Sequence, residues 1–246
     1  MRLIVCDGVS KSGSTFLFRL CRHLLPNISI RDRLNWTPPY VHMEETGDTE
    51  SGFVTDIMSL LEDLATAKVN SESNMVVKVH HLKALPRKKF NSVGRIIHLA
   101  SIRDPFDTAV SLFDQSKKEL ERKRLGLSYR QVFNELTSPN IALNYVIKQM
   151  ETICRYGDDS MKLLLYPFFI KLSEVNIQLL GSVLGVSKAE LLEGVAAIEK
   201  LSRESLYTEF NVGAEGRGQM VMHEFEPATA EAARRLFNKI CRKIGR

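Results

Sequence analysis

Apolar and polar positions follow two different periods along the chain. Four runs are short, apolar and rich in valine, isoleucine or leucine, which is typical of buried strands. They span residues 3–6, 75–80, 95–102 and 161–166. Between and after these runs, apolar residues recur at the spacing of amphipathic helices. The expected helices span residues 15–25, 53–68, 140–155, 170–184, 188–199 and 228–244, and a further helix starts at residue 105.

Strands that alternate with helices predict a three-layer α/β fold, in which a central parallel sheet carries helices on both faces. We expect residues 1–246 to form a single domain, because no repeat or linker interrupts the pattern. Asp104 followed by Pro105 predicts a capped helix start. Two polar segments, Arg31–Gly52 and Lys117–Ser138, are candidate lids or walls of an acceptor site.

Composition narrows the class of protein only slightly. The chain has 34 lysines and arginines against 29 aspartates and glutamates, a formal net charge of +5 that suits an anionic ligand. The four cysteines are far apart and form no C-x-x-C pair, which argues against a disulfide framework or a zinc site and favours a reducing compartment. No apolar run approaches the ~20 residues of a membrane helix, and the N-terminal run is too short for a signal peptide. We therefore expect a cytoplasmic protein without a membrane anchor.

A glycine- and serine-rich turn follows the first expected strand. Gly8 and Gly13, followed by Ser14 and Thr15, have the spacing of a Walker A loop, G-x-x-x-x-G-K-[ST], but Ser14 stands in the lysine position. The lysine lies inside the loop, at Lys11. Such a turn at a helix N-terminus binds phosphate through backbone N–H groups and the helix dipole. The alternative is an ordinary strand-to-helix turn, and we predict a P-loop-like phosphate site.

A lysine and a histidine end the second expected strand. Because side chains alternate along a strand, Lys78 and His80 project to one face while Val79 and His81 project to the other. Ligands bind at the carboxyl ends of the strands in open parallel sheets, and a histidine there can take a proton from a hydroxyl. The neighbouring Lys78 cation favours a neutral His80, as a base requires. The alternative is a structural histidine, which is the interpretation we give to the other histidines, including His98.

An arginine ends the third expected strand, and a serine follows in the next helix. Arg103 and Ser111 are eight positions apart, so together they are candidates to hold a second phosphate. The alternative pairs Arg103 with Asp107 and packs Ser111 inside the helix, and spacing alone favours this alternative.

Taken together, these motifs resemble the sulfotransferases that use 3′-phosphoadenosine 5′-phosphosulfate (PAPS). Residues Ser10–Phe16 are similar in order to the 5′-phosphosulfate loop P-K-S-G-T-T-W of that family, and Lys78–His80 is similar to its K-T-H-L strand. Arg103 and Ser111 keep the spacing of its 3′-phosphate motif, R-N-P-x-D-x-x-x-S. A later strand that ends in a tyrosine resembles the run to Tyr166.

The chain departs from the family pattern at several positions. Ser10 stands for the proline and Phe16 for the tryptophan of the loop. Residues Asn211–Gly218 keep the glycine spacing of the family's R-K-G-x-x-G-x-W loop but lack its Arg-Lys pair and its tryptophan. Arg217 is the candidate replacement for those cations.

The resemblance implies transfer of a sulfuryl group from PAPS, as co-substrate and without a metal, to a hydroxyl or amine of a small-molecule or glycan acceptor. It implies that His80 removes the acceptor proton, while Lys11 and Lys78 stabilise charge on the leaving group and the sulfuryl group. The implied nucleotide contacts are Lys11, Ser12, Gly13, Ser14 and Thr15 at the 5′-phosphate, Arg103 and Ser111 at the 3′-phosphate, Phe16 and Tyr166 near adenine, and Gly216 and Arg217 in the closing loop.

Two other functions compete with this interpretation. One is a Mg-dependent P-loop kinase for a small molecule, although Ser14 replaces its lysine and the later strands end without the acid that holds the metal. The other is a nucleic-acid-binding module that uses the basic run Lys117–Arg124. That run mixes both charge signs and has the pattern of a solvated helix face, so we expect no nucleic-acid partner.

Overall fold

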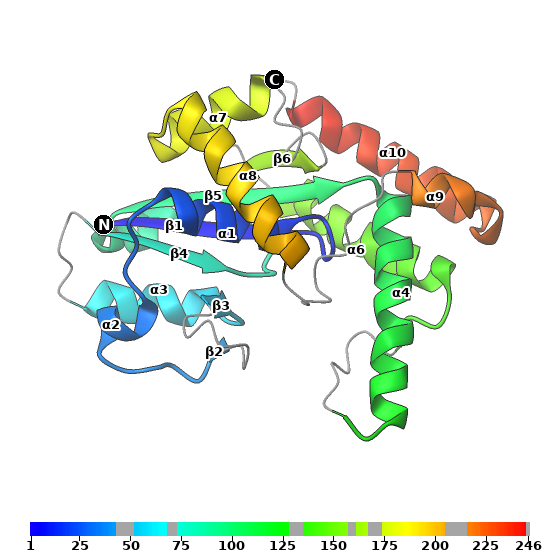
Figure 1. The fold of residues 1–246 in the computed structure, drawn as a ribbon, viewed down its shortest axis with the longest axis horizontal. Helices are drawn as coiled ribbons and strands as arrows, with labels where there is room; N and C mark the ends of the chain where they lie inside the picture. Colours follow the sequence, from blue (N-terminus) through cyan, green and yellow to red (C-terminus); the bar gives the residue numbers. More distant parts are fainter. Residues whose placement is uncertain are drawn as a thin grey trace.

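A six-stranded sheet forms the centre of the protein (Figure 1). The computed structural model describes residues 1–42, 52–67, 73–127, 135–156, 161–166, 174–204 and 216–244. The strands are β1 (Arg2–Gly8), β2 (Val41–His42), β3 (Phe53–Val54), β4 (Asn74–Lys78), β5 (Arg95–Arg103) and β6 (Met161–Tyr166). They lie in the order β2-β3-β4-β1-β5-β6, with β3, β4, β1, β5 and β6 parallel and β2 antiparallel to β3 at one edge. The predicted α/β fold with a central parallel sheet is confirmed.

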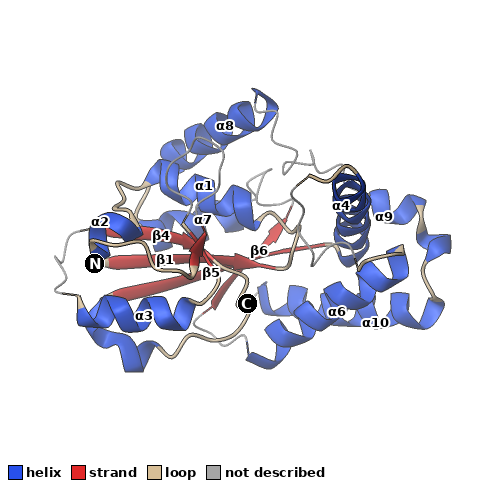
Figure 2. Cartoon of the chain, turned by 90° about the horizontal axis from the view of Figure 1, so that it is seen from below, coloured by secondary structure: helices blue, strands red, loops and turns tan. Residues whose placement is uncertain are grey.

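Helices cover both faces of this sheet, as Figure 2 shows from below. Along β1, Ile4 and Cys6 face a core formed with α1, α7 and α8, whereas Leu3 and Val5 face the core on the opposite side. That opposite side is covered by α3 and η1 and, further along the sheet, by α4, α6 and α10. The helices are α1 (Ser14–Leu24), α2 (Ile30–Leu34), α3 (Ile57–Thr66), η1 (Arg87–Val93), α4 (Pro105–Arg124), α6 (Pro139–Tyr156), α7 (Glu174–Leu184), α8 (Lys188–Glu204), α9 (Arg217–Met220), η2 (Met222–Glu224) and α10 (Pro227–Ile244).

Two of the sequence expectations were wrong in detail. The segment expected as a polar loop from residue 31 contains α2 and β2, because Ser29 caps α2 by accepting from the Asp32 N–H; its residues 43–51 lie outside the described residues. The helix expected from Phe53 begins at Ile57 instead. Asp56 accepts from the N–H groups of Met58 and Ser59 and so starts the helix after the short strand β3.

The candidate lid segment from Lys117 is helical in its first part, as the pattern of a solvated helix face predicted for Lys117–Arg124. Helix α4 continues to Arg124, and Figure 1 shows this end of the helix extending away from the sheet. Most of the basic run is exposed, as a solvated helix face requires, although Glu119 is buried. Residues 128–134 of this candidate lid segment lie outside the described residues. The predicted start of α4, with Asp104 as cap and Pro105 in the first turn, is confirmed.

Among the described residues, no helix combines the length and the apolar character that crossing a membrane requires.

Candidate functional site

Four parallel strands end at the same edge of the sheet and carry most of the predicted site residues there. The last residues of β1, β4, β5 and β6 are Gly8, Lys78, Arg103 and Tyr166. Parallel strands place their carboxyl ends on one edge, which is where open α/β sheets bind ligands. The topology therefore brings together motifs that are up to about 160 positions apart in the sequence.

The loop after β1 leads directly into α1. Gly13, with φ of 94°, is the residue before the helix, and no side chain caps the first turn. The N-terminal N–H groups of a helix have no partner within the helix and carry partial positive charge. The first turn of α1 contains no acidic residue. The start of α1 is thus suited to an anion such as phosphate.

Tyr166 holds this loop against the end of β6. A methyl group placed on Gly13 would lie 2.6 Å from Cδ2 of Tyr166, so the ring packs directly on the glycine. The Arg103 guanidinium carbon lies 5.1 Å from the centre of the same ring. Tyr166 is therefore buried between the phosphate loop and Arg103, and it joins the two halves of the candidate site.

Ser12 attaches the loop after β1 to the neighbouring strand β5. Its N–H donates to the Val9 carbonyl, and its hydroxyl lies 2.7 Å from the Ser101 carbonyl and 2.9 Å from the Ser101 hydroxyl. Both donors of Ser12 are thus used inside the protein. Ser12 thus shapes the loop by attaching it to β5, and its contact with a phosphate stays a prediction.

Ser10 explains one departure from the family pattern. Its N–H donates to Oε1 of Gln149 on α6 over 2.9 Å, and Nε2 of the same amide reaches its hydroxyl over 3.2 Å. A proline in this position would have no N–H to donate. The serine thereby attaches the start of the loop to α6, on the side of the sheet opposite α1.

Lys78 lies beside the start of α1. Its Nζ donates to Oγ1 of Thr15 over 2.7 Å and lies 5.5 Å from the centre of the Phe53 ring. A lysine in contact with the first turn of the helix adds a full charge to the partial charge of the N-terminus. The structure therefore brings Lys78 and Thr15 into contact at the start of α1.

His80 follows β4 and is exposed at the same edge. Its Nδ1 lies 3.2 Å from the carbonyl oxygen of Gly8, and its ring makes an edge contact with Phe53 at 5.8 Å. A carbonyl oxygen only accepts, so the hydrogen bond requires a hydrogen on Nδ1. In the neutral imidazole this leaves the lone pair on Nε2, and Nε2 is then the atom able to take a proton.

Arg103 and the glycines near the C-terminus meet at Asp107. Arg103 Nη2 lies 3.6 Å from Oδ2 of Asp107, and the buried carboxylate also accepts from the N–H groups of Gly216 (3.0 Å) and Gly218 (2.8 Å). Gly218 approaches α4 so closely that a Cβ would lie 2.3 Å from Cβ of Phe106. The ion pair with Asp107 is the alternative that the spacing favoured. Although it pairs with Asp107, the Arg103 guanidinium lies at the carboxyl end of β5, two strands away from Lys78 at the end of β4.

The remaining predicted residues take varied positions. Lys11, with φ of 64°, donates from Nζ to Oε1 of Gln115 on α4 over 3.3 Å, and Arg217 forms an ion pair with Asp114 on the same helix. Ser14 is buried at the start of α1, and Ser111 is buried about two turns into α4. The expected closing loop is described only from Gly216, since Asn211–Glu215 lie outside the described residues.

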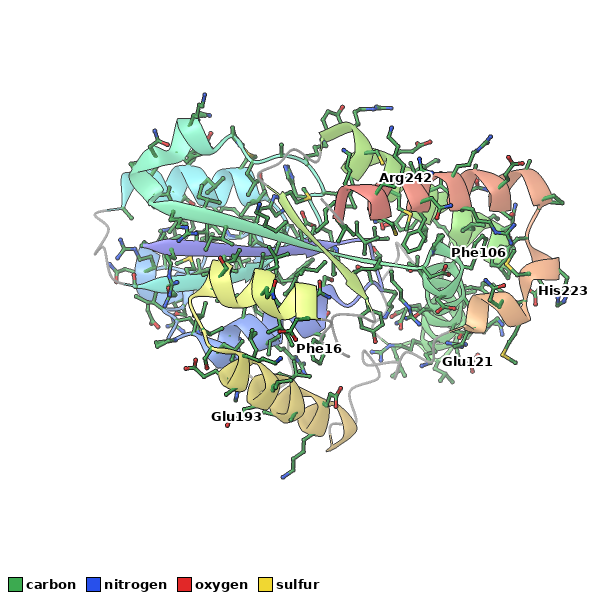
Figure 3. The ribbon with its side chains drawn as sticks, turned by 90° about the horizontal axis from the view of Figure 1, so that it is seen from above. Phe16, Phe106, Glu121, Glu193, His223 and Arg242 are labelled. Atoms are coloured by element: carbon green, nitrogen blue, oxygen red, sulfur yellow. The ribbon has the colours of Figure 1, made fainter. Side chains whose placement is uncertain are left out.

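Phe16 belongs to the hydrophobic core. Its side chain is 5% exposed and packs with side chains of α1, α7 and α8. Figure 3 labels Phe16 beside these helices. The ring thus packs in the core in this structure, and its contact with adenine stays a prediction.

Sequence reasoning missed a buried acid next to the site. Asp7, the last residue before Gly8, is fully buried and lies 3.0 Å from Nε2 of His98, which is buried on β5. Two polar residues inside apolar strands were a signal for such a pair, because buried charges are nearly always paired. Gln115 and Gln149 gave no comparable signal in the sequence.

Burial shifts three ionisable groups near the carboxyl edge towards their neutral forms. It raises the pKa of Asp104 above its ordinary value and lowers the pKa of His81. It also raises the pKa of the Cys6 thiol, which lies against Cys21. Within the described ranges, no group of three His, Cys, Asp or Glu side chains is arranged to hold a metal ion.

Comparison with known proteins yields distant similarities. No family model matches the chain, and no curated protein matches it at a significant level. The chain is similar to retinol dehydratase, solved with androsterone and the inactive cofactor PAP: identity is 17%, the TM-score is 0.42, and the match covers 97% of this chain and 80% of that one. It is also similar to the sulfotransferase domain of the Synechococcus PCC 7002 olefin synthase, with 13% identity, a TM-score of 0.33, and coverage of 95% and 86%. At these values neither similarity assigns an activity to this chain.

Proposed function

We propose that the chain is a sulfotransferase that moves a sulfuryl group from PAPS to a hydroxyl or amine of a small-molecule or glycan acceptor. The observation that carries this proposal is the arrangement at the carboxyl edge of the sheet. There the start of α1 and Lys78 lie beside the exposed His80, and Arg103 ends the strand on the other side of β1. A nucleotide with a sulfated 5′-phosphate and a 3′-phosphate requires cations in two places, and this edge provides them.

The proposed reaction is an in-line displacement at sulfur. The acceptor oxygen or nitrogen forms a bond to sulfur as the bond between sulfur and the bridging phosphate oxygen breaks, and the bridging oxygen leaves with that electron pair. Nε2 of His80 takes the proton of the acceptor, because Nδ1 faces the Gly8 carbonyl. Lys11 stabilises the charge on the departing oxygen and Lys78 assists at the sulfuryl group, where fixed charges contribute through their position. Arg103 holds the 3′-phosphate.

This chain has a further cation, the buried Arg103, which a site for ATP alone does not require. Arg103 is buried at the end of β5 and pairs with Asp107 of α4, the helix that also carries the buried Ser111, so a second anion there would meet a preformed cation. Tyr166 connects that cation to Gly13 of the phosphate loop. These contacts support the 3′-phosphate as the feature that distinguishes PAPS from ATP.

We also propose a cytoplasmic location, because the four cysteines are far apart in the sequence and form no C-x-x-C pair.

The test is transfer of labelled sulfate from PAPS to a panel of acceptors, with wild type compared with His80→Ala. We expect turnover in the wild type and a loss of about 10²–10⁴-fold in kcat for the variant, with nucleotide affinity kept. His23→Ala, on the far end of α1, is the matched control and should turn over normally. Near-normal turnover of His80→Ala would remove His80 as the base.

A further inference from the structure

Lys11 has an unusual backbone conformation in the middle of the phosphate loop. Its φ of 64° lies in the left-handed region, which residues with a side chain rarely adopt. Glycine adopts this conformation without strain, yet the sequence has a lysine there. A strained residue persists only where the surrounding structure holds it in place. The contacts of the residues on either side of Lys11 show what holds it.

Ser10, on one side of Lys11, is held by a single side chain of α6. The Ser10 N–H donates to Oε1 of Gln149 over 2.9 Å, and Nε2 of the same amide donates to the Ser10 hydroxyl oxygen over 3.2 Å. A backbone N–H only donates, so the amide oxygen faces it and the amide nitrogen faces the hydroxyl. The two bonds together fix the position of Ser10 and the orientation of the Gln149 amide.

The part of α6 that carries Gln149 is anchored in the core. Val146 and Met150 of this helix are fully buried in a cluster that also contains Val9, the residue before Ser10. Val9 is itself fully buried, so apolar packing and the Gln149 amide attach the same short stretch of the loop to one helix. Gln149 is therefore a fixed point for the start of the loop.

Ser12, on the other side of Lys11, is held by β5. Its hydroxyl lies 2.7 Å from the Ser101 carbonyl, and its N–H donates to the Val9 carbonyl over 3.0 Å. Both neighbours of Lys11 are thus attached to elements far away in the sequence, at separations of 139 and 89 positions. Only one residue lies between these two attachments, so its left-handed conformation is imposed from both sides.

The amide of Gln149 holds the loop without adding a charge to it. A second amide, that of Gln115 on α4, accepts from Nζ of Lys11 over 3.3 Å. A glutamate in place of Gln149 could accept from both the N–H and the hydroxyl of Ser10, but it would place a negative charge beside the candidate phosphate site. A neutral amide is therefore the side chain that suits a loop intended for an anion.

From these contacts we infer that Gln149 is a positioning residue of the phosphate loop: through Ser10 it holds the backbone of Lys11 in its left-handed conformation in the protein without ligand. A loop that is already ordered loses less conformational freedom on binding, so it binds an anion more tightly than a loop that must first be ordered. The consequence for catalysis rests on the proposed function. The conformation of the loop does not.

Hydrogen exchange at the Ser10 amide tests the inference in the protein without ligand. We expect slow exchange in the wild type and at least about tenfold faster exchange in Gln149→Met, which has a side chain of similar length but no amide. In Gln149→Glu the exchange should stay slow, because the carboxylate still accepts from Ser10. Gln178→Met, at an exposed position of α7, is the matched control and should change nothing.

Two results of this experiment would overturn the inference. One is fast exchange at the Ser10 amide in the wild type, a measurement for which no variant has to fold. The other is unchanged exchange at that amide in a folded Gln149→Met.

Calorimetry with 3′-phosphoadenosine 5′-phosphate tests the consequence for the ligand. Gln149→Met should bind it about 3- to 10-fold more weakly, because the loop must then be ordered on binding. Gln149→Glu should lose affinity by a similar factor of about 3 to 10 although its Ser10 amide stays protected, because the new charge repels phosphate. General damage to the fold would not separate affinity from exchange in this way.

Gln178→Glu is the control for charge, since it makes the same change at an exposed position. Its affinity should stay within about twofold of the wild type, because water and salt screen an exposed charge. Wild-type affinity in a Gln149→Met whose Ser10 amide exchanges fast would overturn the inference, and so would equal losses in Gln149→Glu and Gln178→Glu.

The two proposals fail in different ways. If no acceptor is sulfated but exchange at Ser10 responds to Gln149→Met and not to Gln149→Glu, the positioning inference stands and the proposed function falls. If sulfate is transferred but Gln149→Met keeps both slow exchange at Ser10 and the wild-type KM for PAPS, the proposed function stands and the positioning inference falls.

Discussion

Replacing Gly13 by alanine tests how the phosphate loop is held. Two costs follow from the structure. The φ of 94° is a conformation that costs residues with a Cβ about 1–2 kcal/mol. The new methyl group would also lie 2.6 Å from the Tyr166 ring, and forcing a buried ring to move costs about 1–3 kcal/mol. We expect Gly13→Ala to lower the free energy of unfolding by the sum, about 2–5 kcal/mol.

Gly126→Ala is the matched control for backbone strain. Gly126 also has a positive φ, 68°, but no atom lies within 4 Å of the place where its Cβ would be. The control should therefore lose only the conformational part, about 1–2 kcal/mol. The difference between the two variants isolates the contact with Tyr166.

Urea denaturation of both glycine variants, and of Gly13→Ala combined with Tyr166→Leu, provides the measurement. Removing the ring relieves the collision, so the double variant should recover about 1–3 kcal/mol relative to the sum of the single changes. Equal losses in Gly13→Ala and Gly126→Ala, with additive behaviour in the double variant, would refute the packing of Tyr166 on the loop.

Three further changes test other parts of the site. Arg103→Ala should weaken binding of 3′,5′-bisphosphate about 10- to 100-fold while 5′-monophosphate binding stays within about threefold, measured by calorimetry; equal losses would contradict the 3′-phosphate assignment. Asp107→Asn loses part of the acceptor for Gly216 and Gly218, so hydrogen exchange at those amides should accelerate about tenfold or more, and unchanged protection would contradict the contact. Asp104→Asn keeps a helix cap but removes a carboxyl whose folded-state pKa is raised by burial. A raised pKa means that the folded state binds the proton more tightly, so wild type should lose stability relative to this variant as pH rises through and above the ordinary aspartate pKa. A constant difference between the two unfolding free energies from pH 3 to 7 would contradict that burial effect.

The sequence predicted the elements that rest on local signals. The apolar runs became β1, β4, β5 and β6, and the Asp104-Pro105 pair marked the start of α4. Local patterns succeed there because strand burial and helix capping depend on residues close in the sequence. Phe53 was expected in a helix, yet it pairs with Lys78 as part of β3, because pairing with a distant strand outweighed helical periodicity.

The candidate site was predictable where motifs carry the chemistry, and less so where tertiary contacts decide it. Thr15 and Lys78 meet because β1 and β4 are neighbours, an outcome consistent with the motifs. Ser12 and Phe16 were expected at the nucleotide. In the structure the Ser12 hydroxyl donates to the Ser101 carbonyl of β5, and the Phe16 ring packs in the core, two contacts that only the tertiary fold creates. Three of the four donors around Asp7, on His81, Leu82 and His98, come from distant segments, so no spacing in the sequence indicates them.

The central claim is that the carboxyl edge of this sheet binds a nucleotide with both 3′- and 5′-phosphates. Calorimetric titration with 3′-phosphoadenosine 5′-phosphate, with ATP·Mg as the competing ligand, tests this claim most directly. Since Arg103 is expected to hold the 3′-phosphate, the bisphosphate should bind without Mg and at least about tenfold more tightly than ATP·Mg. Tighter binding of ATP·Mg, or no measurable binding of the bisphosphate, would contradict the account.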